Sequence, residues 1–308
     1  MSVLRSAFIA LSHDQSIRSF AETSSVGTKL SSRFVAGLNI EDALRVCAQV
    51  NQQGMHVTLD SLGESVTTAD EAHRAADIYH QLLDQIAARK LDSNISVKLT
   101  QMGLTQDSAL AEQIATSLTE HAQSTGNFVR IDMEDSPLTQ TTLDIVRRIH
   151  AQPGLRGHIG IVIQAYLYRS QADIESLIAD GIRVRLCKGA YKEPAEVAFP
   201  KKSDVDTNYI KLGDMLLQSP IYHGLATHDE KMIAAAKAFA AQRGIDRSRF
   251  EFQMLFGVRR DLQRQLVAEG YNVRVYIPFG HEWYPYFMRR LAERPANVFF
   301  IAKNLLRK

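Results

Sequence analysis

Residues 95–131 read ISVKLTQMGLTQDSALAEQIATSLTEHAQSTGNFVRI, and this stretch decides the fold. It begins and ends with short apolar runs, at 95–99 and 128–131, which are typical of buried strands. Between them, over residues 107–123, apolar side chains recur at intervals of three and four, which predicts a helix. Because Asp107 can cap the first turn of that helix, we predict a strand–helix–strand unit here.

The same alternation continues along most of the chain. From about residue 55 we predict eight strands, at 56–59, 95–99, 128–131, 159–163, 182–186, 222–226, 250–253 and 273–277. Between the strands, helical periodicity is found at 69–90, 107–123, 138–150, 204–218, 229–243 and 257–269. Asp107 and Asp229 stand where two of these helices begin, and Gly126, Gly181, Gly244 and Gly270 stand near expected helix ends. Parallel strands with crossover helices close most naturally into a (β/α)8 barrel of the TIM type, and an open doubly wound sheet is the alternative.

No linker rich in proline, glycine or serine divides the chain, and no low-complexity tract interrupts it. We therefore predict one α/β unit, a catalytic barrel at 55–308, preceded by a mostly helical segment at 1–54. Leu44, Val46, Cys47 and Val50 give that segment an apolar face, so we expect it to pack on the outside or the bottom of the barrel.

Composition excludes several classes of protein. The chain has 308 residues, 45% hydrophobic and 23% charged, and its net charge of +2 is spread along the sequence, so no nucleic-acid partner is expected. Cys47 and Cys187 form no CxxC pair, which argues against a disulfide scaffold or a bound metal.

No apolar run approaches the roughly 20 residues that span a bilayer, and none resembles a signal peptide. We expect a cytoplasmic protein with at most peripheral membrane contact.

Several catalytic motifs are absent. Gly154, Gly157 and Gly160 have the wrong spacing for the GxGxxG dinucleotide fingerprint. The sequence also contains no phosphate-binding GxxxxGK[ST], no GxSxG nucleophile elbow and no HExxH zinc motif. Phosphoryl transfer and the commonest hydrolase chemistries are therefore not expected.

Polar side chains stand at nearly every strand end. Asp60, Lys98, Asp132, Gln164, Arg185 with Lys188, Thr227 with His228, Gln253 and Tyr276 follow one another in this way. The carboxyl ends of the strands carry the active site in a barrel of this type, so the series predicts a functional site there. Each residue alone has a simpler explanation, since loops after strands are polar and an aspartate often only caps a helix.

Two segments combine cations with aromatic rings. Residues 185–191, RLCKGAY, place Arg185, Lys188 and Tyr191 at one strand end, which suits an anionic ligand with a flat, electron-rich part such as a redox cofactor. Near the end, residues 283–293 read WYPYFMRRLAE and predict a helix with Glu293 one turn after Arg289 and Arg290. These arginines could form routine solvated ion pairs, but the nearby tyrosines favour a small pocket for a carboxylate.

Eight segments in order make the sequence resemble the proline dehydrogenases, in their small monofunctional bacterial form. They are Thr58-Leu59-Asp60-Ser61-Leu62-Gly63-Glu64, Ser96-Val97-Lys98-Leu99, Arg130-Ile131-Asp132-Met133-Glu134, Gln164-Ala165-Tyr166, residues 185–191, Ala226-Thr227-His228-Asp229, Phe252-Gln253-Met254-Leu255 and residues 286–293. One such segment is a weak signal, whereas eight at consecutive strand ends are specific.

The resemblance implies a distorted barrel that holds FAD noncovalently, with hydride passing from C5 of L-proline to N5 of the flavin. It assigns the substrate carboxylate to Arg289 and Arg290, oriented by Glu293. It places Lys98, Asp132, Tyr191, Leu255, Tyr276 and Tyr286 around the substrate. It gives the flavin to Gln164, Arg185, Lys188, Gly189, Ala190, Thr227, His228 and Gln253.

The resemblance also implies a membrane quinone as electron acceptor and a separate pyrroline-5-carboxylate dehydrogenase for the product. Contact with the inner face of the membrane could come from Val298-Phe299-Phe300-Ile301, which could equally pack on the barrel. Two other functions remain open. One is a non-catalytic barrel that binds a flavin or a carboxylate, and the other is a lyase that uses Lys98 or Lys188 as a Schiff base.

Overall fold

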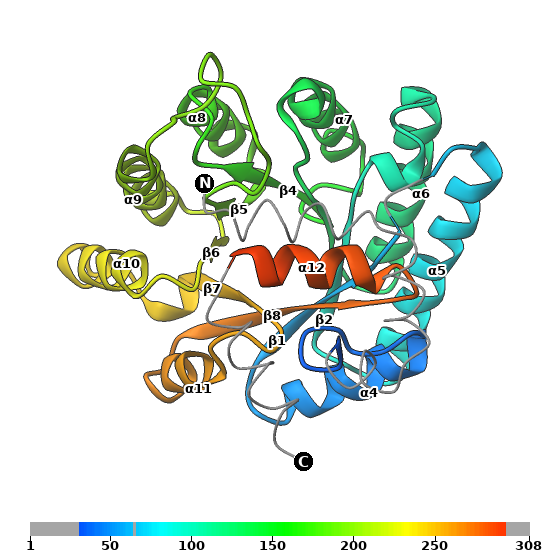
Figure 1. Cartoon of the computed structure of the whole chain (residues 1–308), viewed down its shortest axis with the longest axis horizontal. Helices are drawn as coiled ribbons and strands as arrows, with labels where there is room; N and C mark the ends of the chain where they lie inside the picture. The colour runs from blue at the N-terminus through cyan, green and yellow to red at the C-terminus, as the bar shows by residue number, and fades with distance from the viewer. Residues whose placement is uncertain (1–30, 64–65, 294–308) are drawn as a thin grey trace.

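The computed structural model describes residues 31–63 and 66–293, and in the last helix it describes side chains as far as Met288. Its parallel strands follow one another around a closed barrel in the order of the sequence, enclosed by a ring of helices (Figure 1). The predicted barrel is confirmed. The open doubly wound sheet is wrong, because the first strand pairs with the last from His56↔Arg274 to Ser61↔Phe279.

Each predicted strand is present, with its ends moved by two residues at most. The strands are β1 (His56–Ser61), β2 (Ser93–Val97), β3 (Val129–Ile131), β4 (Ile159–Gln164), β5 (Arg183–Cys187), β6 (His223–Ala226), β7 (Phe250–Leu255) and β8 (Asn272–Phe279). The helices between them are α5 (Ala69–Ala88), α6 (Ser108–Ser124), α7 (Thr139–His150), α8 (Ser170–Asp180), α9 (Lys202–Gln218), α10 (Glu230–Arg243) and α11 (Arg260–Ala268). Short 3₁₀ turns lie at η1 (Thr100–Met102), η2 (Ser136–Leu138) and η3 (Arg247–Arg249).

The predicted helix ends carry the expected caps. The Asp107 side chain accepts a hydrogen bond from the Ala109 backbone at the start of α6, and Asp229 does the same for Lys231 at α10. Gly181 and Gly244 follow α8 and α10 in the left-handed conformation, with φ of 80° and 64°. These caps satisfy backbone groups that a helix leaves without partners.

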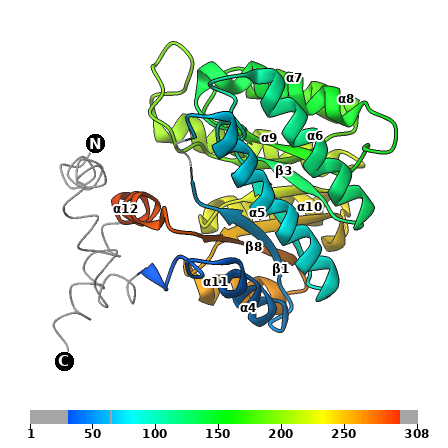
Figure 2. The ribbon, with the colours of Figure 1, turned by 90° about the vertical axis from the view of Figure 1, so that its right-hand side faces the viewer.

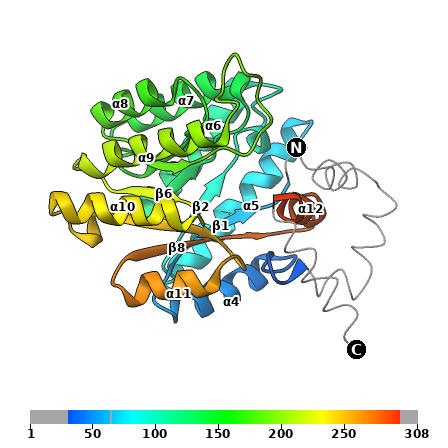
Figure 3. The same ribbon diagram turned by 60° about the vertical axis from the view of Figure 1, so that its left-hand side comes forward.

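Two helices depart from a regular barrel. Helix α4 (Ile40–Asn51) packs against β1 and β8, between α11 and α5 in the outer ring (Figure 1). Helix α12 (Trp283–Glu293) follows β8 and lies beyond the carboxyl ends of the strands instead of returning along the barrel (Figures 2 and 3). The segment expected at 1–54 therefore supplies α4 to the outer ring, while residues 1–30 lie outside the described part.

The barrel is apolar on its outer surface and polar inside. Alternate strand residues such as Ile95, Val97 and Phe252 are buried against the helices. The residues between them face the interior, and among them are Thr58, Ser96, Arg130, Arg185, Glu251, Gln253, Arg274 and Tyr276. Barrels of this type usually fill their interior with branched apolar side chains, so this polar interior needs a functional explanation.

Candidate active site

Asp132, directly after β3, is where side chains from three other strands meet. Its Oδ1 accepts hydrogen bonds from Nη1 of Arg185 at 2.8 Å and from Oγ of Ser96 at 2.7 Å. Its Oδ2 accepts from the Tyr276 hydroxyl at 2.9 Å and lies 3.8 Å from Nζ of Lys98. One carboxylate thus holds two cations and a phenol together at the carboxyl end of the barrel, where the sequence predicted a site.

Arg185 is almost completely buried at this centre. Its Nε donates to Oε1 of Gln253 at 2.5 Å, and its guanidinium carbon lies 5.2 Å from the centroid of the Tyr276 ring. Its Nη2 is buried and has no hydrogen-bond partner among the described residues. Because a buried donor without a partner is costly, this nitrogen is suited to an acceptor atom of a bound ligand.

Lys98 is held by a second carboxylate. Its Nζ lies 3.4 Å from Oδ2 of Asp60, which is buried within β1. The Tyr79 hydroxyl donates to Oδ1 of Asp60 at 3.3 Å, and burial raises the pKa of Tyr79 well above its usual value. A protonated phenol therefore supports Asp60, and Asp60 with Asp132 fixes the ammonium of Lys98.

Gln164 and the residues after β5 form one side of the site. Nε2 of Gln164 donates to the backbone oxygen of Glu134 at 2.8 Å, and the Ala190 amide donates to Oε1 of Gln164 at 3.4 Å. Gly189 has φ of 121°, and a Cβ there would lie 2.4 Å from the ring of Tyr166. Only glycine lets the backbone pass this close to the ring.

Lys188 is paired with two carboxylates. Its Nζ donates to Oδ1 of Asp206 at 2.5 Å and to Oδ2 of Asp229 at 2.8 Å. Burial by itself lowers the pKa of Lys188, but these two hydrogen bonds outweigh it, and the pKa of Lys188 is raised above its usual value. Lys188 is therefore a fixed positive charge at the mouth of β5.

The ends of β6 and β7 are joined through His228. The Leu255 amide donates to Nε2 of His228 at 2.9 Å. Since Nε2 acts as an acceptor, the neutral ring carries its proton on Nδ1. Oγ1 of Thr227 accepts from the Asp229 amide at 3.1 Å, so this hydroxyl also shapes the start of α10.

Two tyrosines predicted to line the substrate pocket, Tyr191 and Tyr286, differ in their exposure to solvent. Tyr191, after β5, is exposed, with 39% of its surface accessible. Tyr286 is buried in a cluster with Phe34, Trp283 and Phe287. Arg289, Arg290 and Glu293 lie in the last turns of α12, but their side chains, and the apolar run at 298–301, are outside the described residues.

Sequence reasoning did not single out Glu193, which ties the β5–α9 loop to the rest of the site. Its carboxylate accepts from the amide and the hydroxyl of Ser136, at 2.7 Å and 2.5 Å. The Tyr166 hydroxyl donates to the same carboxylate at 3.4 Å. A lone glutamate in a loop gives no sequence signal, because its partners are 57 and 27 residues away.

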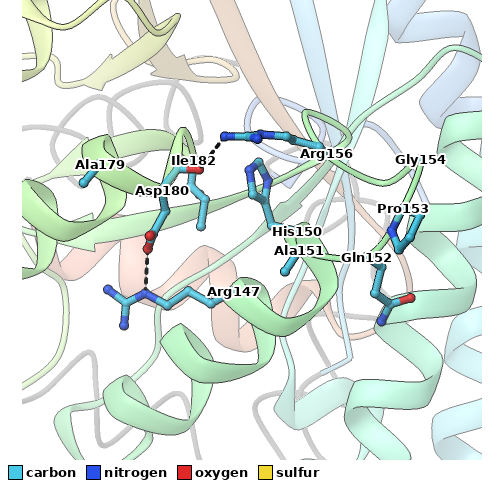
Figure 4. A pocket seen from close by; sticks show the side chains of 10 residues that line it. All are labelled: Arg147, His150, Ala151, Gln152, Pro153, Gly154, Arg156, Ala179, Asp180 and Ile182. Carbon is cyan, nitrogen blue, oxygen red and sulfur yellow. Dashed lines mark hydrogen bonds and ion pairs between the residues drawn. The ribbon is translucent and has the colours of Figure 1, made fainter.

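A cavity of about 690 Å³ lies away from these residues, at the amino-terminal ends of β4 and β5 (Figure 4). Arg147, His150, Arg156 and Asp180 are among its lining side chains, and none of the predicted site residues lines it. Nε of Arg147 donates to Oδ2 of Asp180 at 3.0 Å across this cavity. Among the described residues, no helix is long and apolar enough to cross a membrane.

Comparison with known proteins matches the family model "Proline dehydrogenase" over residues 43–303. The chain belongs to the proline dehydrogenase family. It is 43% identical to proline dehydrogenase 2 of Bacillus subtilis (strain 168), over 90% of each chain. It is 41% identical to the proline dehydrogenase of Deinococcus radiodurans, again over 90% of each chain.

Longer members of the family share the same unit. The bifunctional protein PutA of Escherichia coli is 30% identical over 87% of this chain but only 24% of its own length. In the crystal structure of PutA from Bdellovibrio bacteriovorus, inactivated by N-propargylglycine, the match covers 86% of this chain and 32% of that chain, with a TM-score of 0.81 and 27% identity. The matched part of this chain thus corresponds to about a third of that longer protein.

Proposed function

We propose that this chain oxidises L-proline to Δ1-pyrroline-5-carboxylate with a noncovalently bound FAD, as the first step of proline catabolism. Membership of the family supports an oxidoreductase that acts on proline. The catalytic unit in this proposal is the barrel at 55–308, with the segment at 1–54 packed on it.

The observation that carries the flavin assignment is the buried Nη2 of Arg185. A flavin ring offers nitrogen and oxygen acceptors, and its reduced form is anionic, so a buried cation with a spare N–H fits it. Gln164, Gly189 and Ala190 would line the ring and its chain beside Arg185. Lys188, Thr227, His228 and Gln253 complete the proposed cofactor residues, and the fixed charge of Lys188 suits the phosphates.

Proline would be held on the other side of the site. Arg289 and Arg290, oriented by Glu293, would bind its carboxylate in the bidentate way that guanidinium groups favour. Lys98, Asp132, Tyr191, Leu255, Tyr276 and Tyr286 would surround the pyrrolidine ring.

FAD, when bound, supplies the hydride acceptor for C5 of proline. The protein's own part is to orient the substrate and to keep charges fixed around it. Asp132 would keep Arg185, Lys98 and Tyr276 in place around the substrate. Loss of hydride from C5 would leave the ring nitrogen as an iminium, which releases its proton to solvent to give the imine product.

A Schiff-base lyase is a weaker alternative. A lysine nucleophile needs a lowered pKa, whereas the pKa of Lys188 is raised by Asp206 and Asp229. Lys98 remains the other candidate, and the experiment below tests it.

The test is the absorption spectrum of the purified protein, read before and after anaerobic addition of L-proline. A flavin spectrum that bleaches with proline supports the proposal. A colourless protein that borohydride traps covalently with substrate would support the lyase. A flavin spectrum that proline leaves unchanged would support a binding protein without this activity.

The acceptor of the electrons is proposed to be a membrane quinone, reached through peripheral contact at the inner face of the membrane. A separate pyrroline-5-carboxylate dehydrogenase would use the product. Quinone reduction by the proline-reduced protein, with and without lipid vesicles, tests the first part of this proposal.

A further inference from the structure

A hydrogen-bonded column runs along the inside of the barrel and ends at Arg185. Nε of Arg274 on β8 donates to both oxygens of Glu251, at 2.8 Å and 3.0 Å. Oε1 of Glu251 accepts from Nε2 of Gln253 at 2.5 Å, and Oε1 of Gln253 accepts from Nε of Arg185 at 2.5 Å. Glu251, Gln253 and Arg185 are 3%, 4% and 6% exposed, so water does not compete with these bonds.

The chemistry of the two ends fixes the direction of the Gln253 amide. A guanidinium can only donate hydrogen bonds, and an ionised carboxylate can only accept them. Burial by itself raises the pKa of Glu251, but Arg274, the hydrogen bond from Gln253 and the charge of Arg130 together outweigh burial and lower the pKa, which keeps the carboxylate ionised. Only one orientation of the Gln253 amide satisfies both neighbours, with its oxygen toward Arg185 and its nitrogen toward Glu251.

Gly224 on β6 leaves the space that this amide occupies. Gly224 pairs with Arg185 on one side and with Glu251 on the other. A Cβ at Gly224 would lie 2.3 Å from Nε2 of Gln253. The backbone angles of Gly224 do not call for glycine, so space for the amide is the physical reason for glycine at this position.

The column determines which nitrogen of Arg185 faces a ligand. Gln253 holds Nε, while Asp132 and Ser96 hold Nη1. The guanidinium is therefore fixed on two sides, and of its nitrogens Nη2 is the one that has no hydrogen-bond partner among the described residues.

We propose that Glu251 and Gln253, with the space left by Gly224, are positioning residues that hold Arg185 against the flavin. They act through Arg185, and for Gln253 this role is separate from the contact with the cofactor proposed above. This inference rests on the proposed FAD-dependent function. It predicts that the column helps to set the reduction potential of the flavin, because a cation held at the ring stabilises the anionic reduced form.

The sign of the change in potential separates positioning from plain electrostatics. In Glu251→Gln a negative charge is removed, which by itself would raise the potential. The new amide can donate or accept, however, so it no longer orients Gln253, and a less restrained Arg185 would lower the potential. Positioning therefore predicts a lower potential, and a bare charge effect predicts a higher one.

Two further variants leave every charge in place. Gln253→Met removes both links of the amide, and Gly224→Ala displaces the amide by occupying its space. Arg185→Met removes the cation itself, so it should give the largest decrease in the reduction potential of the flavin. Gly213→Ala is the matched control, because a Cβ there meets only Leu225, at 3.8 Å.

The experiment is spectroelectrochemistry of the flavin in each purified holoprotein, with the flavin content measured alongside. We expect lower potentials in Glu251→Gln, Gln253→Met and Gly224→Ala, in the direction of Arg185→Met, and no change in Gly213→Ala. If Glu251→Gln does not fold, the other two variants decide the question. Unchanged potentials in both, or a higher potential in Glu251→Gln, would overturn the inference while leaving the proposed function intact. A parent protein that binds no flavin would overturn the proposed function and the inference with it.

Discussion

Tyr276, proposed to line the substrate pocket, also lies against Arg185, the residue proposed to face the flavin. Its hydroxyl donates to Asp132, its ring faces the guanidinium of Arg185, and its strand neighbour in register is Leu255. Burial and the charge of Asp132 raise the pKa of Tyr276 well above its usual value, so the hydroxyl stays protonated. The ring is therefore held in one place by two polar neighbours, which lets it act as a rigid wall.

A rigid aromatic wall predicts selection by size. We expect the protein to prefer L-proline strongly over trans-4-hydroxy-L-proline, because the ring leaves no room for an added hydroxyl. Tyr276→Ser should lower kcat/KM for proline by roughly tenfold or more and should narrow the preference. The measurement is kcat/KM for both substrates, with Tyr168→Ser, an exposed tyrosine, as the control. A preference that Tyr276→Ser leaves unchanged would remove Tyr276 from the substrate pocket.

At the scale of elements, α12 is the helix proposed to carry the substrate clamp. Its position beyond the carboxyl ends of the strands suits that role (Figure 2). Arg289→Lys and Arg290→Lys should each raise KM for proline by about tenfold, since an ammonium cannot make the paired hydrogen bonds of a guanidinium. Flavin content should remain normal. Arg264→Lys, on the exposed face of α11, is the control, and unchanged turnover in Arg290→Lys would contradict the clamp.

Helices α5 and α6 are joined by a pair of histidines whose Nδ1 atoms, on His80 and His121, are 2.7 Å apart. Nε2 of His121 lies 2.8 Å from Oδ1 of Asp84, and Oγ of Ser117 lies 3.4 Å from Nε2 of His80. At this distance one Nδ1 can donate its proton to the other, but there is no room for a proton on both Nδ1 atoms. The pair is therefore stable only while at least one ring is neutral.

This pair predicts a dependence of stability on pH. Burial and then His121 lower the pKa of His80, against the smaller opposing effects of Asp77 and Asp84. Since the folded pKa lies below the unfolded value, the contribution to stability is complete above about pH 6.5 and is lost as the pH falls below it. His80→Leu should make the free energy of unfolding vary less between pH 7 and pH 5. His73→Leu, at an exposed position of the same helix, is the control and should leave this pH dependence unchanged. If the free energy of unfolding varied with pH equally in the two variants, the prediction would be contradicted.

The strands could be predicted from the sequence because their alternation is local. Val129 and Ile131 face the helices while Arg130 faces the interior, and that pattern is visible without any structure. The meeting of Lys98, Asp132, Arg185 and Tyr276 was also predictable, since each stands near the carboxyl end of a parallel strand. The column from Arg274 to Arg185 was not, because the hydrogen bonds at its two ends join residues on different strands, Arg274 to Glu251 and Arg185 to Gln253. The position of α12 was not predictable either, since no local pattern distinguishes a helix across the barrel mouth from one beside the barrel.

At the scale of the whole molecule, α4 takes the place in the outer ring that α12 leaves. It packs on β1 and β8, the two strands that close the barrel, and Ala43, Leu44, Val46, Cys47 and Val50 are buried in the main core. Asn51 adds hydrogen bonds to the backbone oxygens of Met55 and Asp92, before β1 and β2. If β1 and β8 are held together by this helix, losing its packing should weaken the whole barrel and not only its edge.

We therefore expect Leu44→Ala to lower the free energy of unfolding by about 2–5 kcal/mol, the usual cost of a cavity left by a buried leucine. The loss should appear in one cooperative transition, with far-ultraviolet circular dichroism and flavin absorbance changing at the same denaturant concentration. Gln49→Ala, on the exposed face of the same helix, is the control and should change stability by less than about 0.5 kcal/mol. Two separate transitions in Leu44→Ala, with the flavin retained after α4 has unfolded, would mean that α4 covers the barrel without closing it. A single transition with the parent's steepness but a lower denaturant midpoint would instead identify α4 as the eighth outer helix of the barrel, supplied by the segment before β1.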